Sequence, residues 1–359
     1  MKKETNTIRN KGINITKFIC AIIIACIYHY KNTFKAWKLL DKNILLRVLA
    51  DYGFLLVELF FIISGYLFFI SYYKRIRENK IGFQSFIEKR YLRIIPISAI
   101  SVVVMFILQH IYYYKFEHFW IFNNNDFVNL ILQMTGIQYW MNMSEGSLNN
   151  VTWYISVLLL CYIIYYFITK KSKKYGNIIY PTIVIIFISL LKYEVDLPII
   201  NYYTERGLIA FGIGIILGLV IEKSDIKKLS NCSIIVMAFI LIMTVIFKKI
   251  VLGYLVLFVD LIIFPIILIN IIRFDFLLEK VNLEFTEKLS KISLGIYIWN
   301  LPLQLLFIII VKFNNIKIDY NNIYFFIAQI IIQILFAIFS YKVIEKIINK
   351  FIDKKYILK

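Results

Sequence analysis

The sequence predicts an all-α fold: a polytopic integral membrane protein with about ten transmembrane helices and both termini in the cytoplasm. Hydrophobic residues make up 60% of the 359 residues and aromatic residues 17%, whereas soluble domains are about 45–50% apolar. The apolar residues gather in segments that mostly suffice to cross about 30 Å of hydrocarbon as helices. The basic residues lie between these segments, as the positive-inside rule requires.

The predicted helices correspond to apolar segments separated by polar or charged connections. The fifth and sixth segments are short, and only Lys248 and Lys249 mark the boundary between the seventh and the eighth, so nine or eleven spans also fit the pattern. In chain order, the segments are residues 13–30, 53–72, 94–113, 152–168, 178–191, 207–221, 232–247, 250–272, 292–311 and 323–348.

The net charge of +19 reports orientation rather than nucleic-acid binding. When successive connections are assigned alternately to the two sides of the membrane, the side with both termini holds more than twice as many lysine and arginine residues as the other. The positive-inside rule therefore places both termini in the cytoplasm. With no linker or appended soluble region, residues 1–359 form one predicted membrane domain with short tails at 1–12 and 349–359.

The first two spans carry the residues best suited to acid–base chemistry. His29 ends the first span, and histidine serves well as a general base near neutral pH, although an interfacial histidine can also simply be solvated. Glu58 lies at a similar depth in the second span, where it is placed either to orient an imidazole or to form a structural pair. Lys17 lies twelve positions before His29, about 18 Å along a helix, so the two do not touch. Ser64 and Gly65 interrupt the apolar run, and Gly65 allows a helix or a ligand to approach closely.

Further polar residues follow along the chain, each with two readings. Arg90 and Arg93 lie three apart on one helical face at the inner interface, suited to phosphate recognition or to anchoring. Trp153 and Tyr154 open the fourth span as an aromatic belt or a platform for a sugar. The remaining candidates are Glu205 and Arg206 before the sixth span, Asp260 within the eighth and Asn300 within the ninth. No P-loop, dinucleotide glycines, metal cluster or nucleophile elbow occurs, so we expect no bound cofactor and no metal.

Four stretches carry a resemblance to a known family: the basic residue–apolar helix–His segment that ends at His29, VELFFIISGYLF at 57–68, FIEKRYLRIIP at 86–96 and TWYISVLLLCY at 152–162. Weaker support comes from RGLIAFGIGIILG at 206–218, ISLGIYIWNLPLQ at 292–304 and SYKVIEK at 340–346. In this order, the segments resemble bacterial membrane acyltransferase family 3, the integral-membrane O-acyltransferases. The resemblance covers residues from about 13 to 348.

The resemblance implies a function and a set of roles. His29 takes the central catalytic position, and Arg90 and Arg93 help to engage an acyl-CoA donor. The family usually acylates hydroxyls of cell-surface glycans or their lipid-linked precursors, most often with acetyl groups, in the bacterial plasma membrane. The implied partners are therefore membrane lipids, acetyl-CoA or another acyl-CoA, and a surface glycan or lipid-linked oligosaccharide. Separate glycan-assembly proteins are further candidates.

The chain departs from the family pattern at three points. In the family, ten residues usually separate the basic residue from the histidine, whereas eleven separate Lys17 from His29, and this turns one relative to the other by about 100°. Asn300 stands where many members have a histidine. The esterase-like domain fused to some relatives is missing, so a second enzyme that completes the transfer would be a separate chain.

We therefore expect a membrane O-acyltransferase in which His29 either acts as general base or carries the acyl group itself, with Glu58 orienting the imidazole. Arg90, Arg93 and Lys17 are the expected donor-binding residues. The expected acceptor or pocket residues are Ser64, Gly65, Trp153, Tyr154, Arg206 and Asn300. A transporter or flippase for a lipid-linked sugar, and a membrane sensor or scaffold, are the alternatives that the spans alone also permit.

Overall fold

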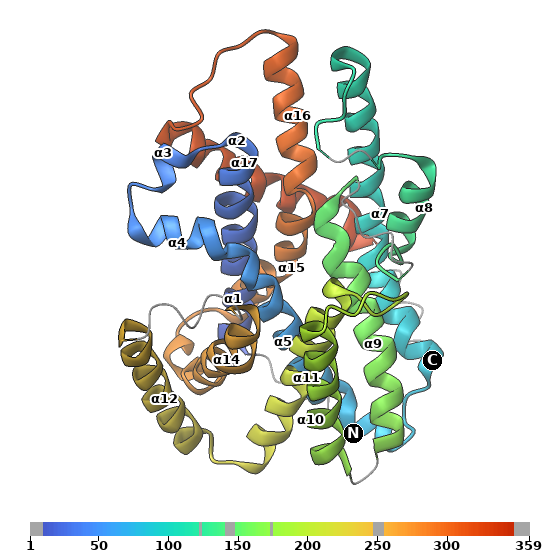
Figure 1. The fold of residues 1–359 in the computed structure, drawn as a ribbon, viewed down its shortest axis with the longest axis vertical. Helices are drawn as coiled ribbons and strands as arrows, with labels where there is room; N and C mark the ends of the chain where they lie inside the picture. Colours follow the sequence, from blue (N-terminus) through green and yellow to red (C-terminus); the bar gives the residue numbers. More distant parts are fainter. Residues whose placement is uncertain (1–9, 122–123, 141–147, 173–174, 247–254, 348–359) are drawn as a thin grey trace. The chain divides into compact units, whose positions relative to one another are not determined.

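A computed structural model describes residues 10–121, 124–140, 148–172, 175–246 and 255–347. The regular elements in these ranges are helices (Figure 1), and an isolated bridge joins Leu197 and Ile200. The predicted all-α fold class is therefore confirmed. Lys248, Lys249 and the predicted tail 349–359 lie outside the described residues.

The elements, in chain order, are α1 (Lys11–Ile22), η1 (Ile23–Tyr28), α2 (His29–Phe34), α3 (Trp37–Leu40), α4 (Ile44–Tyr52), η2 (Gly53–Leu55), α5 (Leu56–Phe68), η3 (Phe69–Tyr73), α6 (Lys74–Arg77), α7 (Phe83–Phe116), α8 (Phe127–Thr135), η4 (Asn150–Thr152), α9 (Trp153–Ser172), α10 (Gly176–Lys192), α11 (Tyr202–Lys223), α12 (Ile226–Ile246), α13 (Leu255–Phe258), η7 (Val259–Ile263), α14 (Phe264–Arg273), η8 (Asp275–Leu278), α15 (Leu283–Ile298), α16 (Asn300–Phe313), α17 (Ile323–Ser340) and η9 (Tyr341–Glu345). Of these, η1, η3, η7 and η9 are π-helical.

Seven helical segments in the described part of the chain are long and apolar enough to cross a membrane. They are Lys11–Phe34, Ile44–Arg77, Phe83–Phe116, Asn150–Ser172, Tyr202–Lys223, Val256–Arg273 and Ile323–Ile344. An eighth is added if α15 and α16, which meet at a bend of 52°, form one broken span, and α10 is apolar but shorter. The chain is thus a multi-pass membrane protein, while the count of ten and the orientation stay predictions.

The chain divides into two compact units, each assembled from separate stretches. Unit 1 comprises Met1–Thr16, Val57–Ser85 and Leu160–Glu287, and unit 2 comprises Lys17–Leu56, Phe86–Leu159 and Lys288–Lys359. Neither unit is a continuous piece of chain. The sequence predicts a single membrane domain, and this stays a prediction. The structure divides the chain into the two compact units.

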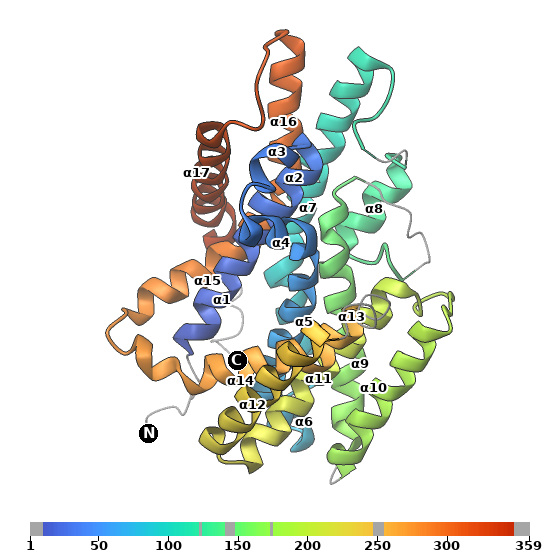
Figure 2. The same cartoon turned by 60° about the vertical axis from the view of Figure 1, so that its left-hand side comes forward.

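Two glycines bring α5 and α11 together in unit 1. A Cβ on Gly65 would collide with the backbone carbonyl of Phe211, and one on Gly214 would collide with the carbonyl of Ile62 and lie 3.0 Å from the Cα of Gly65. Small residues are a general means of close helix approach in membranes, where apolar side chains gain little from leaving lipid. Elsewhere in unit 1, α10 packs along α11 (Figure 1) and α12 along α14 (Figure 2).

In unit 2, the segment from η1 to α2 contacts α4, α16 and α17. Tyr30 is buried against this core, and its hydroxyl donates a hydrogen bond of 2.7 Å to the carbonyl of Tyr320. Rings of Phe34, Phe325 and Phe326 pack around Tyr30. The helix that begins at His29 is therefore held on several sides by apolar packing.

The predicted orientation can be tested with two matched cysteine variants. Lys317 and Lys280 are both exposed, and one predicted span separates them. In a Cys232→Ser background, which removes the exposed cysteine of the four, we expect Lys317→Cys to react with a membrane-impermeant thiol reagent on intact cells. Lys280→Cys should react only after the cells are opened. The reverse pattern would contradict the orientation, and equal labelling of both would contradict the span count between them.

Candidate active site

His29 begins α2 directly after the π-helix η1. Its ring is half-buried and meets the ring of Tyr28 edge-on, with 5.1 Å between the centroids. Among the described residues, neither ring nitrogen has a hydrogen-bond partner. Since π-turns are frequent at functional sites, the local geometry and the available ring nitrogens both suit a proton-accepting role.

Gln304 on α16 fixes the helix face that carries His29. Its Nε2 donates to the carbonyl of Ala25 at 3.4 Å, and its Oε1 accepts from Oγ1 of Thr33 at 2.6 Å. Ala25 and Thr33 lie four residues before and after His29, about one turn away on either side. Asn300 lies one turn before Gln304, so the two amides share one face of α16. Through Gln304, this face contacts the segment that carries His29.

Lys17 lies close enough to Arg90 and Arg93 to interact electrostatically with both, and all three belong to unit 2. Lys17 and Arg90 are half-buried, and Arg93 is exposed. Three cations gathered in this way repel one another, so the arrangement favours a ligand that carries several negative charges. The sequence suggested each residue separately, and the structure adds that they form one group.

Trp153 and Tyr154 are buried at the start of α9 rather than exposed. The ring of Tyr154 meets that of Tyr297 edge-on at 5.8 Å. The pair therefore faces the interior of unit 2, which does not suit an aromatic belt in contact with lipid headgroups. That Trp153 and Tyr154 serve as a platform for a sugar stays a prediction.

Glu58 pairs with Arg206 in unit 1. Nε of Arg206 donates to Oε1 of Glu58 at 2.7 Å, Nη2 makes a second contact with the same oxygen, and both side chains are buried. Asp260 interacts electrostatically with both residues, and the guanidinium lies 4.9 Å from the ring centroid of Tyr202. Oε2 of Glu58 and both oxygens of Asp260 accept no hydrogen bond within the described ranges.

This ion pair bears on two predictions from the sequence. The sequence predicts that Glu58 orients His29, but in the structure its carboxylate pairs with Arg206. Glu58 belongs to unit 1 and His29 to unit 2. Its action on His29 stays a prediction. Asp260, a candidate from the sequence within the eighth predicted span, joins Glu58 and Arg206 in one group of charges. Ser64 is half-buried on the same helix as Glu58, and Gly65 is used there for helix packing.

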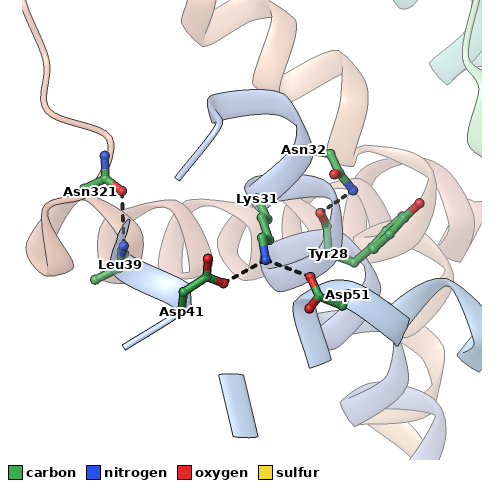
Figure 3. A network of polar contacts seen from close by, with 7 residues as sticks. All are labelled: Tyr28, Lys31, Asn32, Leu39, Asp41, Asp51 and Asn321. Atoms are coloured by element: carbon green, nitrogen blue, oxygen red, sulfur yellow. Dashed lines mark hydrogen bonds and ion pairs between the residues drawn. The ribbon is translucent and has the colours of Figure 1, made fainter. Parts of the chain in front are cut away.

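A second ion-pair network lies two residues beyond His29 and was not found from the sequence. Nζ of Lys31, a buried side chain, donates to Asp41 at 2.9 Å and to Asp51 at 2.7 Å (Figure 3). The same ammonium lies 4.6 Å from the ring centroid of Trp37. These contacts tie α3 and both ends of the segment between Asp41 and Asp51 to α2. The side chain of Lys31 thus ties α3 and α4 to the helix that begins at His29.

Comparison with known proteins identifies one family. A family model described as an acyltransferase domain matches residues 10–342, nearly the whole chain. No curated protein and no solved structure matches the chain. Within the described residues, no three histidine, cysteine, aspartate or glutamate side chains gather in a way that could hold a metal ion.

The charges around Arg206 predict unequal effects for two neutral substitutions. Arg206→Gln should lower the free energy of unfolding by about 3–5 kcal/mol, because Glu58 then stays buried without its cation while the second carboxylate, Asp260, repels it. Glu58→Gln should cost less, since Arg206 still faces Asp260. Thermal unfolding of the detergent-solubilised protein measures both, with Lys223→Gln, an exposed basic residue on α11, as the control. Equal losses for the two variants would contradict the shared role of Arg206.

Proposed function

The chain belongs to acyltransferase family 3, and on this basis we propose that it moves an acetyl group from acetyl-CoA to a hydroxyl of a cell-surface glycan or of its lipid-linked precursor. It would do so as a multi-pass protein of the bacterial plasma membrane. The observation that carries the proposal is the content of unit 2: a histidine with available ring nitrogens and a group of three cations occur in one compact unit. The comparisons give no support to the transporter or flippase alternative.

The three cations support an acyl-CoA donor. Coenzyme A carries several phosphate charges, which Arg90, Arg93 and Lys17 can neutralise together. Arginine suits this role because its guanidinium binds phosphate oxygens through two parallel hydrogen bonds. The predicted orientation places Arg90 and Arg93 on the cytoplasmic side, where acyl-CoA is made.

The chemistry assigned to His29 is proton transfer. One ring nitrogen takes the proton of the acceptor hydroxyl while its oxygen attacks the thioester carbonyl. The new C–O ester bond forms, the C–S bond breaks, and the proton on the imidazole passes to the departing thiolate of coenzyme A. A second route first transfers the acyl group to the imidazole and then to the hydroxyl. Both routes use the same residue, and Gln304 holds the helix face on which it lies.

The proposed function is tested at His29, with another of the three histidines as the control. We expect His29→Ala to lower the rate of label transfer from acetyl-labelled acetyl-CoA to glycan by about 10²- to 10⁴-fold, because the general base is lost. His110→Ala should leave the rate unchanged, since His110 is exposed on α7. The rate is measured in membranes, with protein amounts compared by immunoblot. Transfer at the normal rate in His29→Ala would overturn the catalytic assignment.

Donor binding is tested separately from turnover. Arg90→Ala and Arg93→Ala should each weaken coenzyme A binding by about 1.5–3 kcal/mol, the range for a hydrogen bond to a charged group. The corresponding lysine variants should recover only part of the affinity, because an ammonium lacks the planar fork. Arg75→Ala serves as the control, since Arg75 is an exposed residue of the same predicted connection. Titration of the solubilised protein with coenzyme A gives the affinities, and unchanged values in both alanine variants would favour simple membrane anchoring.

A further inference from the structure

Unit 2 contains a buried group of amide and hydroxyl side chains around the break between α15 and α16. Its amide members are Gln133, Gln138, Asn149 and Asn300, and its hydroxyl members are Ser101 and Thr152, all buried. None of these side chains is charged. The group therefore differs in kind from the two ion-pair networks, and neither the proposed proton transfer nor the phosphate contacts use it.

Asn149 connects the members of this group. Its Nδ2 donates to the carbonyl of Ile298 at 2.9 Å and to Oγ of Ser101 at 3.1 Å. Its backbone N–H donates to Oε1 of Gln133 at 3.2 Å, and its carbonyl accepts from Oγ1 of Thr152 at 2.8 Å. One fully buried residue thus links α7 and the end of α15 through its side chain, and α8 and η4 through its backbone.

The sequence explains why the carbonyl of Ile298 is available to Asn149. In an uninterrupted helix, this carbonyl would accept from the N–H of residue 302. Residue 302 is a proline, which has no N–H, and the helix bends by 52° between Ile298 and Asn300. Broken helices inside a membrane protein are tolerated where the freed backbone groups are buried in protein or face a polar cavity. Asn149 replaces the missing donor.

The hydrogen bonds also fix which amide atoms are left over. Nδ2 of Asn149 faces a carbonyl, and so does Nδ2 of Asn300, which donates to Tyr297 at 2.8 Å. Nε2 of Gln138 donates at 3.1 Å to Oγ1 of Thr152, whose own proton is used on Asn149. A flipped amide would place two acceptors together. The other ends are therefore oxygens: Oδ1 of Asn149, Oε1 of Gln138 and Oδ1 of Asn300.

These three oxygens are buried and accept no hydrogen bond from the residues that the structure describes. Buried polar atoms normally find partners, and exceptions in one place call for an explanation. We propose that the amide group is a substrate subsite, in which the three oxygens accept hydrogen bonds from uncharged hydroxyl or amide N–H groups of a bound substrate. The inference rests on the proposed function for its two possible sources, the acceptor glycan and the pantetheine arm of the donor.

The position of the subsite favours the acceptor hydroxyls. Ser101 lies eight residues beyond Arg93 on α7, about 12 Å further along the helix from the proposed phosphate contacts. Gln133, Gln138 and Asn149 come from the connection that the positive-inside rule assigns to the outer side. Asn300 lies one turn from Gln304, which holds the face carrying His29. The amide of Asn300 reaches the backbone carbonyl of Tyr297, whose ring meets that of Tyr154 in unit 2. Protein sites for sugars combine aromatic rings with amides.

Two variants that remove an acceptor oxygen test the subsite: Gln138→Met and Asn300→Leu. Gln109→Met is the matched control, because Gln109 is an equally buried amide of unit 2 whose two ends are both satisfied, by Ile121 and by Trp120. Purified surface glycan of the producing cells, stripped of its acetyl groups by mild base, is the acceptor probe. Coenzyme A and 3′-phosphoadenosine 5′-diphosphate, which lacks the pantetheine arm, are the donor probes.

If the acceptor occupies the subsite, both variants raise the Kd for glycan, measured by titration, at least tenfold and leave coenzyme A binding unchanged. If the pantetheine arm occupies it, they weaken coenzyme A binding at least tenfold and leave the arm-free nucleotide unaffected. Unchanged constants for every probe would overturn the proposal and leave a hydrated structural group. The titrations test the subsite without turnover. Failure of the wild-type protein to transfer acetyl would therefore contradict the proposed function and leave the test of the subsite intact.

A measurement on the unmodified protein guards against variants that do not fold. Amide hydrogen exchange at Asn149 and Thr152, whose backbone groups belong to the network, should slow at least threefold when the saturating occupant, glycan or coenzyme A, is added. The arm-free nucleotide should have no such effect. Exchange that is unchanged with both glycan and coenzyme A would also overturn the subsite.

Discussion

A polar group buried among apolar helices must find a partner inside the protein, and this constraint shapes both units. In unit 1, Glu58 meets Arg206, and the facing glycines Gly65 and Gly214 let their two helices approach closely. In unit 2, Lys31 is buried between two aspartates, and Asn149 takes over a carbonyl that a proline leaves free. Each polar contact also fixes how its helices are arranged, because breaking it would leave a group without water or partner.

The same constraint separates structural polar groups from those suited to substrates. Gln304 uses both ends of its amide within the fold, and Lys31 has two carboxylates and a ring. His29 and the oxygens of Asn149 and Asn300 have no such partners among the described residues. Proteins keep unsatisfied groups of this kind mainly where a ligand, water or reaction uses them. Unit 1 also holds such oxygens, on Glu58 and Asp260. In unit 2 they occur together with His29 and three neighbouring cations, and this combination supports the proposed chemistry there.

The sequence could predict what depends on local composition. Apolar runs predict the helices, and the predicted segments fall on helix where the structure describes them, apart from the break at Trp299. The hydrogen-bond and ion-pair partners could not be predicted from the sequence, because Glu58 and Arg206 are 148 residues apart and Asn149 and Ile298 are 149 apart. Nothing periodic links Lys31 to Asp41 and Asp51 either. One missed feature did leave a local signal: residues 292–311 were read as one span, yet Pro302 removes the N–H that a continuous helix needs at Ile298.

The π-helix before His29 gives a physical reason why the chain can depart from the family spacing. Eleven residues separate Lys17 from His29 where family members usually have ten, and in an unbroken α-helix the extra residue would turn Lys17 away by about 100°. The π-helix η1 lies between the two, and its i→i+5 hydrogen bonds enclose one residue more per turn than those of an α-helix. A π-turn therefore absorbs an inserted residue without rotating the flanking α-helical parts. The structure agrees with this, since Lys17 still faces Arg90 and Arg93 while His29 lies on the face held by Gln304. The extra residue is thus compatible with Lys17 being the equivalent of the family's basic residue.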